Sequence, residues 1–142
     1  MNACAVNPPR DSSGRGHILV VDDEDALLEI YTAILQRHFE VTAARNAAEA
    51  ERYLQQTAFK VIVADHLMPG ESGLDFLTRT RALQPQMQRV LVTGNMTPEM
   101  KQLARETNAL FAYLIKPISI AELLTVVRAA AELYDGTLAA TP

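Results

Sequence analysis

Residues 18–25 read ILVVDDED, so that a run of four apolar side chains is followed directly by four acidic ones. The apolar run is short, aliphatic and without polar alternation, which is typical of a strand buried on both faces of a parallel sheet. We therefore predict a buried strand over residues 17–21. Its carboxyl end would carry the acidic cluster.

The same arrangement recurs along the chain. Strand-like apolar runs occupy residues 61–64, 89–93 and 111–115, and a weaker, alternating run at 40–44 indicates an edge strand. Between these runs, apolar residues recur every three or four positions, which predicts amphipathic helices. The two clearest stripes are Leu27, Tyr31, Ile34, Leu35 and His38, and Ile120, Leu123, Leu124, Val127 and Tyr134. Five successive strand-then-helix units predict a doubly wound α/β sandwich.

Residues able to cap helices stand before the predicted helices. They are Asn46, Ser72, Thr97 before Pro98, and Ser119 with Glu122 three residues later. Asp25 is expected in the first turn of a helix, where a negative charge is favourable.

Composition restricts the class of protein. The chain has 142 residues, 49% of them apolar and 21% charged, with a net charge of −4, which is typical of one globular domain. Because Lys and Arg form no long cluster, we expect no direct binding of nucleic acid or of an anionic membrane. Residues 1–16 and 135–142 lack an apolar period and are predicted to be tails around a domain at 17–134. A single cysteine, Cys4, excludes an internal disulfide and favours the cytoplasm.

Polar side chains follow four of the predicted strands, at the point where each strand ends. They are Asp22 and Asp23, Asp65, Thr93, and Lys116 before Pro117. Function in an open α/β sheet gathers at the carboxyl ends of the strands, so these groups are expected to share one crevice. Two carboxylates about 4 Å apart repel by roughly 4 kcal/mol at an effective dielectric constant of 20, and one Lys offsets part of that.

A hard divalent cation would supply the missing positive charge. Oxygen ligands with open positions suit Mg²⁺, which accepts a phosphoryl oxygen. A carboxylate beside Mg²⁺, a hydroxyl and an ammonium group favours phosphoryl transfer. Asp65 stands alone after a central strand, which makes it the predicted nucleophile.

Four motifs in order give the chain a resemblance to a known family. They are VVDDE at 20–24, DHLMPGESG at 65–73, VLVTG at 90–94 and YLIKP at 113–117. Over residues 17–134 the chain resembles the receiver domains of two-component response regulators. The resemblance implies a flavodoxin-like, three-layer sandwich with five parallel strands in the order 2-1-3-4-5.

The resemblance also implies a role for each site residue. Asp65 would accept a phosphoryl group from a phosphohistidine; Asp23, Asp65 and the backbone carbonyl of Leu67 would bind Mg²⁺ directly, and Asp22 through water. Lys116 would pair with Asp65 and then with the phosphoryl group, which Thr93 would also bind. Tyr113 falls at an aromatic switch position, and the bond before Pro117 is expected to be cis.

The implied partners are a sensor histidine kinase or phosphotransfer protein and a downstream output domain or protein. The helix after Thr93, the strand with Tyr113 and the last helix would form the output surface, through which a homodimer is also possible. The chain would be a stand-alone receiver or the amino-terminal part of a larger, possibly transcriptional, regulator. It would not be an enzyme beyond catalysing its own phosphorylation and dephosphorylation.

Three further expectations concern residues near the acceptor. Leu67 stands where many receivers have a polar residue, and Asn95 stands where Glu, Lys or Arg is common. Because Leu67 cannot orient water, we expect a relatively long-lived phosphorylated form. The side chain of His66 should point away from Asp65 and have a surface or packing role.

Two alternatives remain open at this point. A phosphatase of the haloacid-dehalogenase type also uses a strand-end Asp, a Thr, a Lys and Mg²⁺, and Asp23-x-Asp25 imitates its first motif. Leu27 in place of Thr or Val, and the lack of an acidic pair after Lys116, speak against it. The other alternative is a receiver that serves as an interaction scaffold and is never phosphorylated.

Overall fold

A computed structural model describes residues 15–140 of the chain. Cys4 and the predicted tail at 1–16, apart from Arg15 and Gly16, lie outside these residues. The five strands are β1 (His17–Val21), β2 (Glu40–Ala44), β3 (Val61–Asp65), β4 (Gln88–Thr93) and β5 (Ala112–Ile115). They form one parallel sheet in the order β2-β1-β3-β4-β5, so the predicted topology is confirmed.

The register of the sheet brings the carboxyl ends of the strands to one edge. Val21 of β1 lies opposite Ala64 of β3, and Asp65 lies opposite Val92 of β4. Thr93 in turn lies opposite Ile115, the last residue of β5. The residues that end or directly follow these four strands are therefore neighbours, although they come from segments far apart in the sequence.

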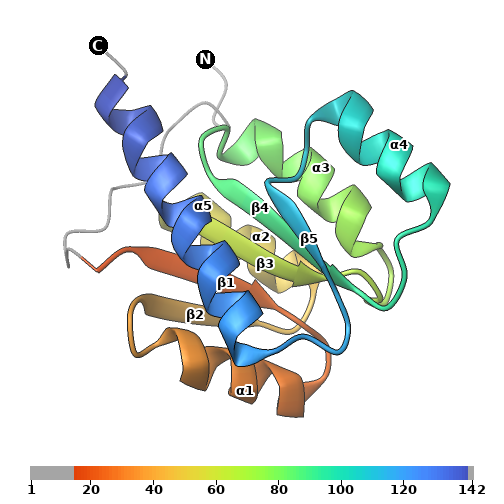
Figure 1. Ribbon diagram of the computed structural model, residues 1–142, viewed down its shortest axis with the longest axis horizontal. Helices are drawn as coiled ribbons and strands as arrows, with labels where there is room; N and C mark the ends of the chain where they lie inside the picture. The colour runs from red at the N-terminus through yellow and green to blue at the C-terminus, as the bar shows by residue number, and fades with distance from the viewer. Residues whose placement is uncertain (1–14, 141–142) are drawn as a thin grey trace.

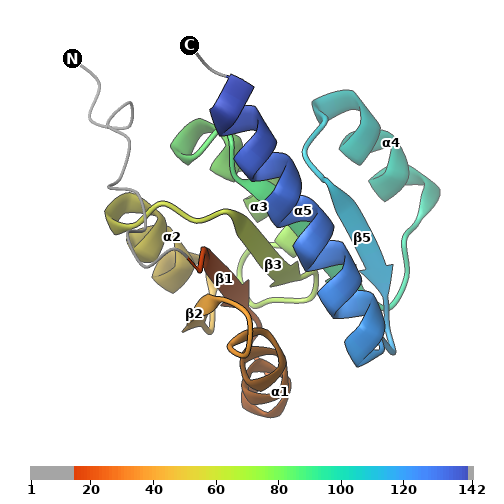
Figure 2. The same cartoon turned by 60° about the vertical axis from the view of Figure 1, so that its left-hand side comes forward.

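Helices cover both faces of the sheet (Figures 1 and 2). The helices α1 (Asp25–Leu35) and α5 (Ile120–Ala140) pack on one face, and α2 (Ala47–Gln56), α3 (Gly73–Leu83) and α4 (Pro98–Thr107) pack on the other. Each face has its own apolar core: Leu19, Ile62 and Leu91 point towards α2 and α3, while their neighbours Val20, Val63 and Val92 point towards α1 and α5. The strands are thus buried on both faces, which explains their uninterrupted apolar sequences.

The predicted helix starts are confirmed by hydrogen bonds. The side chains of Asn46, Ser72 and Thr97 each accept a hydrogen bond from the backbone N–H three residues later. Ser119 and Glu122 form a capping box, in which each side chain accepts from the backbone N–H of the other residue. Asp25 lies in the first turn of α1 as expected, and it pairs with Arg45 at 3.1 Å.

Two predicted details of the helices are wrong. Residues 135–140, predicted as tail, belong to α5. The prediction treated Asp135-Gly136 as a break, but a helix tolerates one glycine at a cost of about 1 kcal/mol, and Asp135 is held by Lys60 at 2.7 Å. The apolar stripes are also shifted: Leu28 is buried in place of Leu27, while His38 and Ile120 are exposed. Residues at the ends of helices escape the sheet because the strands do not extend under them.

No helix within residues 15–140 has the combination of length and apolar sequence needed to cross a membrane.

Candidate functional site

The polar residues predicted from the sequence meet at the carboxyl edge of the sheet. Asp65 and Thr93 are the last residues of β3 and β4, and Asp22 and Lys116 directly follow β1 and β5. Asp22, Asp65 and Thr93 are almost completely buried, with exposed fractions of 1%, 5% and 3%. Buried polar groups need partners, so the contacts of these side chains decide what the site can do.

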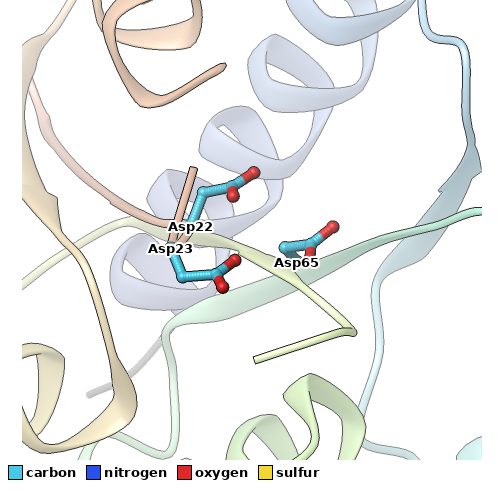
Figure 3. A group of neighbouring side chains, drawn as sticks. All are labelled: Asp22, Asp23 and Asp65. Atoms are coloured by element: carbon cyan, nitrogen blue, oxygen red, sulfur yellow. The ribbon is translucent and has the colours of Figure 1, made fainter. Parts of the chain in front are cut away.

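Three carboxylates form the acidic part of the site. Asp22, Asp23 and Asp65 each offer a carboxylate oxygen, and these oxygens all lie within 4.8 Å of one another. Figure 3 shows the three side chains extending to the same side, two from the segment after β1 and one from the end of β3. Asp23 is exposed, so the cluster is open to solvent on one side.

Asp65 forms an ion pair with Lys116. The distance from Lys116 Nζ to Asp65 Oδ1 is 2.6 Å. Burial alone would lower the pKa of the Lys116 ammonium group, but its hydrogen bond to Asp65 and the charge of that carboxylate raise the pKa above the ordinary value. Lys116 is therefore cationic at neutral pH and neutralises one of the three carboxylates. The peptide bond between Lys116 and Pro117 is cis, as predicted.

Asp22 is the least compensated of the acids. Its Oδ1 accepts a hydrogen bond of 2.9 Å from the backbone N–H of Glu24, but its Oδ2 is buried and has no hydrogen-bond partner among the described residues. Burial raises the pKa of the Asp22 carboxyl; the Glu24 N–H opposes this rise and the Asp65 carboxylate adds to it. A buried oxygen without a donor, beside two further carboxylates, fits a hard cation such as Mg²⁺. The site residues thus match the metal that the sequence predicted.

The hydroxyl of Thr93 is directed to its own loop. It donates to the backbone carbonyl of Asn95 at 2.9 Å and lies 3.3 Å from the backbone N–H of the same residue. The β4–α4 loop is thus closed onto Thr93 by local hydrogen bonds. Thr93 would have to give up its bond to the Asn95 carbonyl to donate to another group.

The loop between β3 and α3 approaches the site through a glycine. A Cβ atom added to Gly73 would lie 2.2 Å from the backbone oxygen of Asp65, closer than any real contact. The Gly73 N–H donates to the carbonyl of His66 at 2.8 Å. Sequence reasoning noted this glycine as part of a turn but missed its steric role. Its position eight residues after Asp65 was the available signal.

The neighbours of Asp65 in this loop differ in exposure. Leu67, the predicted carbonyl ligand, has 76% of its side chain exposed. His66 is half-buried, and its Nδ1 lies 3.4 Å from the backbone N–H of Leu74 at the start of α3. This contact agrees with the packing role expected for His66.

Tyr31 is a second residue whose relation to the site the sequence did not reveal. It was predicted as part of a helix stripe, and it is indeed buried in α1. Burial raises the pKa of its phenol, on which the charges of Lys116 and Asp22 also act. No local sequence signal indicates this proximity, because α1 and Lys116 are brought together by the packing of α1 beside α5.

Tyr113 lies on β5 and is 41% exposed. It borders an open groove of about 470 Å³ between α4 and β5, which Met96, Lys101, Arg105 and Phe111 also line. The predicted switch residue is therefore at the surface, beside a helix none of whose residues is buried.

Comparison with known proteins identifies the family. Residues 18–128 match the model of the response regulator receiver domain. The chain belongs to this family. The receiver interpretation of the four motifs and of the fold is confirmed, and the protein is a receiver domain of two-component signalling.

Several curated relatives are transcriptional regulators. The chain is 35% identical over 120 residues to the hydrogenase transcriptional regulatory protein HoxA of Bradyrhizobium diazoefficiens, covering 84% of this chain and 25% of HoxA. It is 33% identical over 114 residues to the DNA-binding transcriptional regulator NtrC of Azospirillum brasilense, covering 80% of this chain and 24% of NtrC. The chain thus spans about a quarter of the length of these relatives.

Solved receivers share the fold. A CheY-like receiver domain protein of Methanospirillum hungatei superimposes with a TM-score of 0.81 at 26% identity, covering 86% of this chain and 98% of that one. The chemotaxis response regulator CheY4 of Vibrio cholerae gives a TM-score of 0.73 at 26% identity, covering 81% and 98%.

The dehalogenase-type phosphatase gains no support from the geometry. Its motif would need Asp25 near the nucleophile, but Asp25 is exposed and pairs with Arg45. Asp25 is also not among the acids that gather around Asp65.

Proposed function

We propose that Asp65 is the phosphoacceptor of this receiver domain. The observation that carries the proposal is the 2.6 Å ion pair between Lys116 and a buried Asp65, beside an Asp22 oxygen that has no hydrogen-bond partner among residues 15–140. A nucleophile, a positive group and an incompletely neutralised acidic cluster are the parts that phosphoryl transfer needs.

In the proposed reaction, a carboxylate oxygen of Asp65 attacks the phosphorus of a phosphohistidine. The new bond is an acyl phosphate on Asp65, the bond from phosphorus to the histidine nitrogen breaks, and that nitrogen keeps the electron pair. Lys116 Nζ exchanges its contact with the free carboxylate for the phosphoryl oxygens. Thr93 gives up its bond to the Asn95 carbonyl and donates its hydroxyl proton to the phosphoryl group.

Asp23, Asp65 and the Leu67 carbonyl would hold Mg²⁺, and Asp22 would act through water. The bound ion would neutralise charge on the phosphoryl oxygens. The three carboxylate oxygens within 4.8 Å of one another support this assignment. Asp22, with its unsatisfied oxygen, favours binding of a cation over a purely structural role.

The partners follow from the family and remain proposals in detail. The phosphoryl donor is a sensor histidine kinase or a phosphotransfer protein, and the output lies in a domain or protein contacted through α4, β5 and α5. The length of the curated relatives supports an output in transcription, carried by chain beyond this receiver. A homodimer through the same surface and a cytoplasmic location remain predictions, as does the absence of any activity beyond self-phosphorylation and dephosphorylation.

Incubation with acetyl phosphate and Mg²⁺, followed by intact-mass and peptide mass spectrometry, tests the proposal. We expect one added phosphoryl group on Asp65, none on the Asp65→Asn variant, and wild-type behaviour from Asp75→Asn, an exposed residue of α3. A wild-type chain that stays unmodified would favour the scaffold alternative. Modification that persists in Asp65→Asn would show that the acceptor is another residue.

A further inference from the structure

One arginine links the loop of the proposed magnesium site to two helices. Arg79 of α3 holds Glu71 by two bonds, from Nε to Oε2 at 2.9 Å and from Nη2 to Oε1 at 3.0 Å. Its Nη1 also contacts Oε1 of Glu51 in α2 at 2.6 Å. Glu71 lies in the β3–α3 loop, residues 66–72, which begins directly after Asp65. A single guanidinium group therefore joins this loop to α2 and α3.

The geometry of this network is stronger than that of an ordinary surface ion pair. Isolated exposed pairs contribute about 0–1 kcal/mol, but bidentate bonds and networks contribute more. The guanidinium carbon lies 5.0 Å from the centre of the Phe76 ring, and Phe76 is fully buried, so the ring restricts the arginine. The hydrogen bond to Glu71 is the largest influence on the pKa of Arg79, which is raised.

The loop has few other attachments along its middle. Met68 is its one buried residue, while Leu67 and Gly70 are exposed. Gly70 has a φ of +87°, a conformation that a glycine adopts without strain but that nothing near it enforces, because a Cβ there would meet no atom within 4 Å. The hydrogen bond between the His66 carbonyl and Gly73 N closes the base of the loop. Glu71 is thus the charged attachment between the flexible middle and α3.

We propose that Arg79 is a positioning residue for the magnesium site. By holding Glu71, it fixes the path of the loop and therefore the direction of the Leu67 carbonyl. This inference rests on the proposed function, because it takes the Leu67 carbonyl as a ligand of the ion. Arg79 does not touch the ion or the phosphoryl group, so removing it weakens metal binding without removing a ligand.

Calorimetric titration of the full chain with Mg²⁺, without any phosphoryl donor, tests the inference. We expect Arg79→Met to weaken Mg²⁺ binding by about fivefold, below the 10- to 100-fold typical of partners that contact a ligand directly. Glu71→Gln should weaken binding to a similar extent, and the double variant should bind no more weakly than either single variant. Arg79→Lys keeps the charge but not the fork, and should restore part of the affinity.

Arg52→Met is the matched control, because Arg52 is an exposed arginine of α2 with no ion pair among residues 15–140. Its Mg²⁺ affinity should equal that of the wild type. Amide hydrogen exchange adds a second readout: residues 66–72 should exchange faster in Arg79→Met, while β1 and β3 stay protected.

Equal Mg²⁺ affinity of wild type, Arg79→Met and Glu71→Gln would overturn the inference and leave the proposed function intact, even if the melting temperature falls. A wild-type chain that binds no Mg²⁺ would instead overturn the metal assignment on which the inference rests. The two failures are therefore distinguishable in one set of titrations.

Discussion

At the amino-terminal end of the sheet, the buried side chain of Gln84 uses all of its hydrogen-bonding capacity. Its Oε1 accepts from Phe59 N at 2.9 Å, and its Nε2 donates to the carbonyls of Leu54 and Thr57 at 2.8 and 2.7 Å. At the carboxyl end, Asp22 is buried just as deeply, yet its Oδ2 has no hydrogen-bond partner among the described residues. Burial costs free energy in both places, but one end recovers it within the domain.

The comparison separates buried polar groups that stabilise the fold from those that await a ligand. Gln84 connects the end of α2, the segment before β3 and the end of α3. Asp22 lies beside two more carboxylates and one ammonium group, an arrangement that is incomplete without further positive charge. Substitutions at the two ends should therefore have opposite effects on stability.

The largest effect is expected where α3 touches the carboxyl end. In Gly73→Ala, the new Cβ would lie 2.2 Å from the Asp65 backbone oxygen, so the helix or the strand end must shift. We expect a loss of about 3 kcal/mol or more in the free energy of unfolding, measured in urea, since overpacking against backbone is poorly relieved. Gly136→Ala is the control: nothing lies within 4 Å of its Cβ, and it should be neutral or slightly stabilising. Equal stability of the two variants would contradict the close approach.

A somewhat smaller loss is expected at the amino-terminal end. Gln84→Met keeps the length of the side chain but leaves Phe59 N and the Leu54 carbonyl without their partner. We expect a loss of about 2–4 kcal/mol in the free energy of unfolding, with Mg²⁺ affinity unchanged in the folded protein. Gln56→Met, at an exposed position of α2, should have little effect on either quantity. A Gln84→Met variant as stable as the wild type would remove one side of the comparison.

The opposite sign is expected for Asp22→Asn. The amide keeps an oxygen for Glu24 N–H and removes a buried negative charge, so we expect a gain of about 1 kcal/mol in the free energy of unfolding without Mg²⁺, together with weaker Mg²⁺ binding. A loss of stability at neutral pH would show that the carboxylate is structurally compensated after all.

This gain should depend on pH in a defined direction. Because the pKa of Asp22 is raised in the folded state above its ordinary value of 3.8, the folded protein binds the proton more tightly than the unfolded chain. The carboxyl group therefore stabilises the fold at pH values below 3.8, and this contribution is lost as the pH rises through the raised pKa. The advantage of Asp22→Asn over the wild type should accordingly shrink on acidification, as urea titrations at several pH values would show.

The smallest effect concerns the rate of phosphate loss. Leu67 is exposed at the mouth of the site and cannot orient a water molecule. Leu67→Asn should speed the loss of phosphate from Asp65 by about three- to tenfold, followed by mass spectrometry after removal of the donor. An unchanged or slower rate would count against a long-lived phosphorylated form, whereas stability and Mg²⁺ affinity should stay close to those of the wild type.

Much of the fold could be predicted because its signals are local. Strand and helix positions followed from apolar runs, from periodicity and from caps such as Asn46 and Thr97, all of which act within a few residues. The errors occurred where local signals were weak or misleading. Asp135-Gly136 resembled a helix end, and Ile120 continued an apolar stripe beyond the edge of the core.

The amino-acid sequence by itself determined that strands alternate with helices and that Asp22, Asp65, Thr93 and Lys116 stand at strand ends, because these properties depend on residue type and spacing along the chain. Only the tertiary structure decided which groups touch: Lys116 with Asp65, Thr93 with its own loop, Arg79 with both Glu71 and Glu51. Contacts of this kind depend on side-chain direction and on the packing of distant segments. No short-range pattern in the sequence encodes either of them.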